Sequence, residues 1–147
     1  MRGRLIVVGV GIAVVLAAGV VLATRGGDDG QQPTKAKVAG QTLSTRSITA
    51  GDVTVKLTPI RLDSQGAVIS VAFDTHTQEL DLDVAKSARL TVAGIEWSGA
   101  AYSGAGPGGH HREGELRFPV GGPIEKTVRL TITGLSQPVR AEWRLAG

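Results

Sequence analysis

The chain has 147 residues, no cysteine and a formal net charge of +3. Without cysteine it has neither disulfides nor thiolate metal ligands, so a folded part must be held together by its hydrophobic core. Residues 1–47 hold six basic and two acidic side chains, whereas residues 48–147 hold ten basic and eleven acidic ones. The basic excess therefore lies outside the expected folded part, and no nucleic-acid partner is expected.

The N-terminus predicts a membrane segment. Two arginines within residues 1–4 precede residues 5–23, a run of nineteen residues without a charge. A helix of this length spans about 28 Å, close to the hydrocarbon core of a bilayer, and its positive flank is expected to stay in the cytoplasm. We expect an uncleaved anchor that contacts membrane lipid, a cytoplasmic stub at 1–4 and an extracytoplasmic remainder. A cleaved signal peptide, which has a shorter apolar region, is the alternative.

Residues 24–47 predict a flexible linker, because they are rich in glycine, glutamine and aspartate and have almost no large apolar side chains. Residues 48–147 then form one domain of a common size. Apolar and polar residues alternate along most of this domain, which predicts seven or eight short strands of an antiparallel, immunoglobulin-like β-sandwich. The alternating segments are residues 53–57, 69–73, 80–84, 90–97, 116–118, 128–132 and 139–145. Residues 83–88 are the one candidate for a brief helical turn.

All three histidines fall in two short motifs. Asp74-Thr-His76 ends a predicted strand, and because side chains two residues apart share a face, Asp74 and His76 are within chelating reach of one ion. Imidazole is the commonest protein ligand for transition metals, and carboxylates complete such sites. The alternative is that Asp74 caps a turn and His76 is an ordinary surface histidine.

The second motif is His110-His111, which follows the glycine-rich stretch 104–109. Neighbouring residues of a strand face opposite ways, so we prefer His111 as the exposed ligand and keep His110 as a second candidate. A surface pair beside a mobile loop is the alternative. The pattern Gly104-x-Gly106-x-x-Gly109 is not a dinucleotide fingerprint, because a proline and a strand follow where that fold needs a helix.

Other chemistry has less support in the sequence. The alternating Glu79, Asp81 and Asp83 are candidates for calcium ligands or, more simply, for the solvated face of a strand. Trp97 and Trp143 are expected in the core. The alternative for Trp97 is a binding surface that it forms with Tyr102 beside the glycine loop. No arrangement of nucleophile, base and orienting residue is evident, so an enzyme is not expected.

Two resemblances rest on these residues. The pattern Asp74-Thr-His76, Leu80-Asp-Leu-Asp83, Trp97, Gly108-Gly-His-His111 and Gly114-x-Leu-x-Phe118, over roughly residues 52–145, resembles uncharacterised extracytoplasmic domains of bacteria and archaea. This resemblance brings no established activity and implies that the two histidine motifs occur together, as expected of one site. Asp74 and His76 are also similar to the Asp-x-His element of periplasmic copper-resistance β-sandwich proteins, which bind Cu(II). Those proteins also use an N-terminal histidine, whose place His110 or His111 would take here.

The sequence therefore predicts a membrane-anchored extracytoplasmic domain that binds a divalent transition metal, copper(II) or zinc. Its expected ligands are Asp74, His76 and His111, with His110 as the second histidine of its motif. The alternative is a metal-free module that holds an envelope protein or polymer through the loop at residues 99–109 and Trp97.

Overall fold

The computed structural model describes residues 37–38, 41–124 and 127–145. They belong to a compact unit, Gln31–Gly147, with its own core. No helix among the described residues is long and apolar enough to cross a membrane. The segment expected to do so, residues 5–23, lies outside the described residues.

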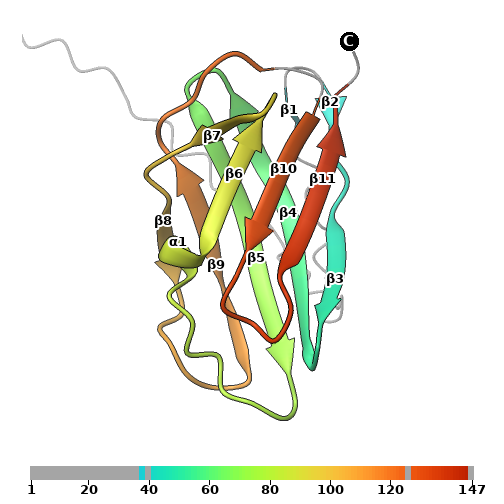
Figure 1. Ribbon diagram of the computed structural model, residues 1–147, viewed down its shortest axis with the longest axis vertical. Coiled ribbons are helices and arrows are strands. Elements are labelled where there is room, and N and C mark those ends of the chain that lie inside the picture. Colours follow the sequence, from blue (N-terminus) through green and yellow to red (C-terminus); the bar gives the residue numbers. More distant parts are fainter. Residues whose placement is uncertain (1–36, 39–40, 125–126, 146–147) are drawn as a thin grey trace, which may run out of the picture. The chain divides into compact units, whose positions relative to one another are not determined.

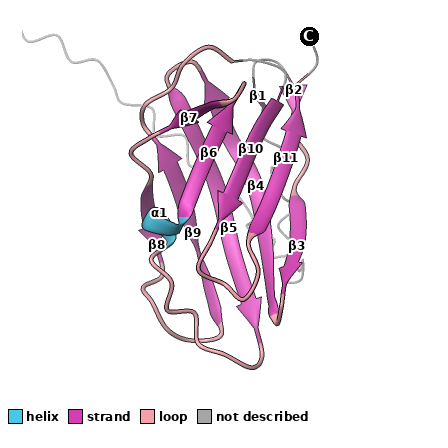
Figure 2. Ribbon diagram, viewed as in Figure 1, coloured by secondary structure: helices cyan, strands magenta, loops and turns pink. Residues whose placement is uncertain are grey.

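The described residues form two antiparallel sheets that pack face to face (Figure 1; Figure 2). The four-stranded sheet has the order β11 (Val139–Arg144), β10 (Thr127–Ile132), β6 (Ala88–Val92), β7 (Ile95–Trp97). The five-stranded sheet has the order β3 (Arg46–Ala50), β4 (Val53–Asp63), β5 (Gly66–Thr75), β9 (His111–Phe118), β8 (Ala101–Gly104). A separate two-stranded sheet pairs β1 (Lys37–Val38) with β2 (Gln41–Thr42), and one helical turn, α1 (Val84–Ser87), precedes β6. The predicted all-β architecture of two antiparallel sheets is confirmed, with nine strands in those sheets.

Alternation along the strands produces the core, because every second side chain of a strand faces the opposite sheet. In β11 the buried residues are Val139, Ala141 and Trp143, and the side chains between them reach solvent. The largest fully buried side chains are Trp143, Phe73, Phe118, Leu57, Leu80, Leu90, Leu116, Leu130 and Ile132. Trp97 is also buried, at 4% exposure, so the alternative that it forms a binding surface is wrong.

The folded part begins earlier than residue 48. That position lies inside β3, Leu43 is buried at 6% exposure, and the Trp143 indole Nε1 donates to the Ser44 carbonyl at 2.8 Å. The expected linker, residues 24–47, therefore contains strands of the domain. Its small and polar residues gave no alternating signal, and pairing with β4 supplies the backbone hydrogen bonds of β3 instead.

Two expected elements differ in the structure. Residues 80–84 alternate like a strand, but they belong to the loop between β5 and α1 and to the first residue of that helix. The Asp83 side chain accepts a hydrogen bond from the Lys86 amide and so caps the helix. Residues 99–109 were expected to be a loop, but Ala101–Gly104 forms the edge strand β8. Gly104 lies opposite Gly114, where an added Cβ would meet the backbone of β9. Glycine thus allows the two strands to approach closely.

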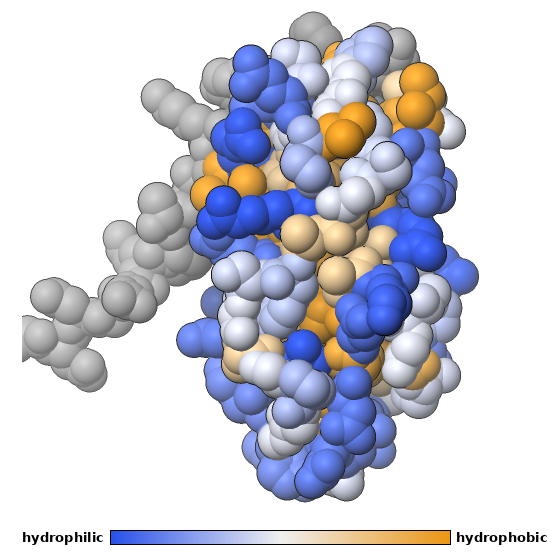
Figure 3. All heavy atoms as spheres, turned by 90° about the vertical axis from the view of Figure 1, so that its left-hand side faces the viewer, coloured by the Kyte–Doolittle hydropathy of each residue, from blue (hydrophilic) through white to orange (hydrophobic). Residues whose placement is uncertain are grey.

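The short strands β7 and β8 form the edges of the two sheets on one side of the domain (Figure 2). Figure 3 faces this side and shows patches of hydrophobic surface between hydrophilic side chains. The exposed large aliphatic side chains of the described part are Ile60, Ile95 and Val120. Single exposed aliphatic residues of this kind are common on the surfaces of folded domains.

Candidate functional site

The two histidine motifs meet where β5 ends and β9 begins. Asp74 and His111 are direct cross-strand partners in the register of β5 and β9. Beyond the strands, the Thr75 amide donates to the His110 carbonyl at 2.9 Å, and the Leu80 amide donates to the Gly109 carbonyl at 3.1 Å. The Gly108 amide returns a hydrogen bond to the Leu80 carbonyl at 3.0 Å. Residues of both motifs are therefore fixed beside one another by backbone hydrogen bonds.

His111 lies between two carboxylates on the exposed outer face of the five-stranded sheet. Its Nδ1 is 3.1 Å from Asp74 Oδ1, and its Nε2 is 3.6 Å from Glu113 Oε2. All three side chains are more than half exposed. The hydrogen bond with Asp74, followed by the charges of Asp74 and Glu113, raises the pKa of His111 above its ordinary value. The imidazole therefore holds its proton more tightly than a free histidine.

The other two histidines take different positions. His76 lies just past the end of β5 and is exposed, and its side chain makes no hydrogen bond or ion pair with another described residue. His110 turns toward the loop after β5, where its Nδ1 lies 3.0 Å from the Gln78 carbonyl. Across residues 37–38, 41–124 and 127–145, no three histidine, aspartate or glutamate side chains converge in a way that could hold a metal ion. The structure thus joins Asp74 with His111 and does not draw His76 and His110 into one ligand set.

Directly behind this pair lies Arg112, a residue that sequence reasoning missed. Its side chain is buried at 4% exposure and points into the domain. Its Nε donates to the Ala105 carbonyl at 2.8 Å, and its Nη1 donates to the carbonyls of Leu80 at 3.2 Å and Leu82 at 2.6 Å. The guanidinium carbon also lies 5.0 Å from the centre of the Tyr102 ring. Arg112 thereby ties the loop after β5 to the loop after β8.

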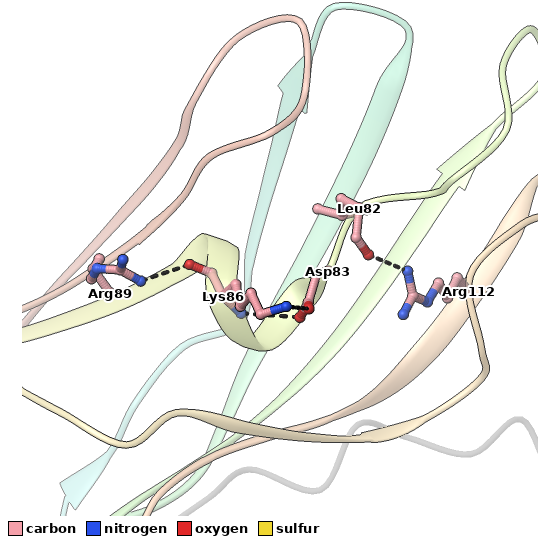
Figure 4. A network of polar contacts seen from close by, with 5 residues as sticks. All are labelled: Leu82, Asp83, Lys86, Arg89 and Arg112. Carbon is pink, nitrogen blue, oxygen red and sulfur yellow. Dashed lines mark hydrogen bonds and ion pairs between the residues drawn. The ribbon is translucent and has the colours of Figure 1, made fainter.

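Figure 4 shows that the contacts of Arg112 lead to the start of α1. Arg112 reaches the Leu82 carbonyl, and the next residue, Asp83, accepts from the Lys86 amide at 3.1 Å and pairs with the Lys86 ammonium at 3.0 Å. The hydrogen bond from the Lys86 amide lowers the pKa of Asp83. Asp83 is therefore engaged in capping the helix, which removes it from the candidate calcium ligands.

The corner around His111 is acidic. Asp74 and Glu113 flank the imidazole, and Glu79 and Asp81 lie in the segment that leaves β5. Within the described part of the chain, none of these four carboxylates pairs with a lysine or arginine. Arg112, which neighbours both His111 and Glu113 in the sequence, donates its hydrogen bonds to backbone carbonyls instead. The excess of carboxylates favours cations at this corner.

No family model matches the chain, and neither a curated protein nor a solved structure matches it.

Proposed function

We propose that this corner of an immunoglobulin-like, membrane-anchored extracytoplasmic domain binds one divalent transition metal, copper(II) or zinc. The observation that carries the proposal is the exposed cross-strand pair of Asp74 and His111, which joins the two histidine motifs at 3.1 Å. A carboxylate and an imidazole at an acidic corner are a ligand set suited to such ions.

The spacing of the pair supports a metal between its two atoms. In zinc sites a histidine nitrogen lies about 2.0–2.1 Å from the metal and a carboxylate oxygen about 2.0–2.2 Å, so a tetrahedral angle separates the two by about 3.4 Å. The present separation of 3.1 Å between His111 Nδ1 and Asp74 Oδ1 is close to that value. A metal would therefore replace the proton that the two groups now share after a movement of a few tenths of an ångström.

The remaining residues take supporting roles in the proposed site. Glu113 faces His111 Nε2 and would accept the proton of that nitrogen, which orients the ring in the way common for metal-binding histidines. His76 follows Asp74 by two residues and is exposed, and it would be the third ligand, with water completing the set. His110 is oriented by the Gln78 carbonyl and is left outside the ligand set.

Isothermal titration of Zn²⁺ and Cu²⁺ into the compact unit Gln31–Gly147 tests this proposal. We expect one equivalent of metal to bind, and His111→Ala or Asp74→Asn to abolish binding while circular dichroism stays unchanged. His76→Ala should weaken binding, and His110→Ala serves as the matched control that retains it. Absence of saturable binding, or equal binding by His111→Ala, would overturn the proposal.

A further inference from the structure

The outer face of the four-stranded sheet is rich in arginine. Arg89 of β6, Arg129 of β10, and Arg140 and Arg144 of β11 occupy the solvent-facing positions between buried residues. The strand register sets Arg140, Thr131 and Arg89 in one row across three strands. The smaller side chains between the arginines are largely threonines, which leave the guanidinium groups accessible.

The carboxylates on this face neutralise only part of its charge. Glu142 is shared between Arg129 at 2.9 Å and Arg144 at 3.5 Å, and Glu96 lies 3.4 Å from Arg89. The hydrogen bond from Arg129 lowers the pKa of Glu142, so this carboxylate is ionised and already engaged.

Two further arginines add to the positive excess at this face. Arg140 makes no ion pair with any residue that the structure describes. Arg46 of β3 adds another guanidinium at the edge of the sheet, where it donates to the Glu142 carbonyl at 3.2 Å. Five arginines thus face two glutamates.

The opposite face is close to neutral. On the five-stranded sheet, the carboxylates of Asp63, Asp74, Glu113 and Glu115 lie on the outer side together with the cations of Lys56, Arg61 and Arg117. The two sheets pack through their inner faces, so these two outer faces point in opposite directions (Figure 1). The positive excess of the described strands therefore lies on the outer face of the four-stranded sheet.

We propose that the arginine face, defined as Arg46, Arg89, Arg129, Arg140 and Arg144, docks on an anionic membrane surface. The charges are spread over the broad outer face of a sheet rather than gathered around a pocket, which suits an extended layer of headgroups better than a single small anion. In the anchored arrangement proposed above, on which this step rests, the chain would also keep the domain within reach of a bilayer. Residues 24–36 alone separate the expected membrane span from Lys37, and thirteen residues cover at most about 45 Å.

Docking through this face has a consequence for the candidate metal site. Asp74 and His111 lie on the outer face of the other sheet. With the arginine face on the membrane, this corner points away from the lipid and stays open to ions in solution. The docking proposal does not require that the corner binds metal.

Vesicle co-sedimentation of the compact unit Gln31–Gly147 tests the inference, because this unit lacks the expected membrane span. Vesicles contain equal parts of phosphatidylglycerol and phosphatidylcholine, or phosphatidylcholine alone. The test variant is Arg129→Gln with Arg140→Gln. The matched control is Lys56→Gln with Arg117→Gln, which removes the same charge from the opposite face.

We expect binding to the anionic vesicles that weakens with salt, and none to phosphatidylcholine. Each arginine near an anionic surface contributes about fivefold in affinity, so the test variant should bind about thirtyfold more weakly. The control should stay within about twofold of the unaltered unit. Equal losses in both double variants would overturn the inference. Binding to soluble polyphosphate without binding to anionic vesicles would also overturn it and identify a soluble polyanion as the partner.

Discussion

Replacement of Arg112 by methionine tests whether one buried side chain holds the candidate site together. The substitution keeps much of the length and apolar stem of the side chain but removes the guanidinium. Three carbonyls, those of Leu80, Leu82 and Ala105, then lose their donor at the point where two loops meet. The stacking on Tyr102 is lost with them.

The expected cost follows from these contacts. A hydrogen bond from a charged donor contributes about 1.5 kcal/mol at the low end of its usual range, and there are three of them. The desolvation of a guanidinium at 4% exposure offsets part of this gain. We therefore expect Arg112→Met to lower the free energy of unfolding by about 3 kcal/mol, which corresponds to a fall in Tm of about 12 °C for a domain of this size.

Urea unfolding followed by tryptophan fluorescence measures this loss, since Trp97 and Trp143 are both in the core. Arg117→Met is the matched control, because Arg117 lies on the same strand but its side chain is exposed. It should change stability by no more than about 0.5 kcal/mol. If Arg112→Met loses less than about 1 kcal/mol, or no more than the control, then the guanidinium does not anchor the two loops and the reasoning is refuted.

Three further predictions follow from local geometry. The pKa of His111 is raised above 6.5 in the folded state, so its pairing with Asp74 stabilises the fold below that pH, and this contribution is lost as the pH rises through the folded pKa. Urea melts of Asp74→Asn should therefore show a larger loss of stability near about pH 5.5 than near about pH 8.5. Equal losses at the two pH values would contradict this. Gly104→Ala places a Cβ against the Glu113 carbonyl oxygen and 2.5 Å from Gly114 Cα of β9, and it should cost about 2 kcal/mol in a thermal melt. Gly106→Ala, with nothing within 4 Å, should be nearly neutral. Ala93 has a φ of 53° in the turn between β6 and β7, so Ala93→Asn should raise stability by about 0.5 kcal/mol, and a lower Tm for this variant would count against a strained turn.

Alternation predicted the sheets well wherever one face of a strand is aliphatic and the other charged. It was misleading at residues 80–84, where Leu80 and Val84 are buried as a strand would bury them. The backbone there is satisfied by the glycine-rich loop and by the cap at Asp83, and neither contact is visible in the hydrophobic pattern. β8 was missed for the converse reason. Its alanine, serine and glycine have little preference for strands, and the strand exists because β9 offers it a partner.

The candidate site was predictable only in part. The pairing of β5 with β9 could not be read from the sequence, yet it is this register that joins Asp74 to His111. The preference for His111 over His110 rested on strand phase, and His111 does lie on the outer face with Asp74. Arg112 was missed because a charged residue is ordinarily assigned to solvent. Its position along the strand was the available signal, because Arg112 lies on the same face as Leu116 and Phe118, which both point into the core.

The start of β9 explains why the buried Arg112 and the exposed pair of Asp74 and His111 lie at the same corner. His110 contacts the loop after β5, His111 faces outward to Asp74, and Arg112 points inward to the carbonyls of the same loops. His111 and Arg112 point to opposite faces because an extended backbone alternates its side chains, whereas His110 precedes the strand. Three consecutive residues thus fix the same corner. Two variants separate these roles within the proposed function. His111→Ala should abolish metal binding with little change in the free energy of unfolding, whereas Arg112→Met should weaken binding and stability together, because it loosens the loops that carry the ligands.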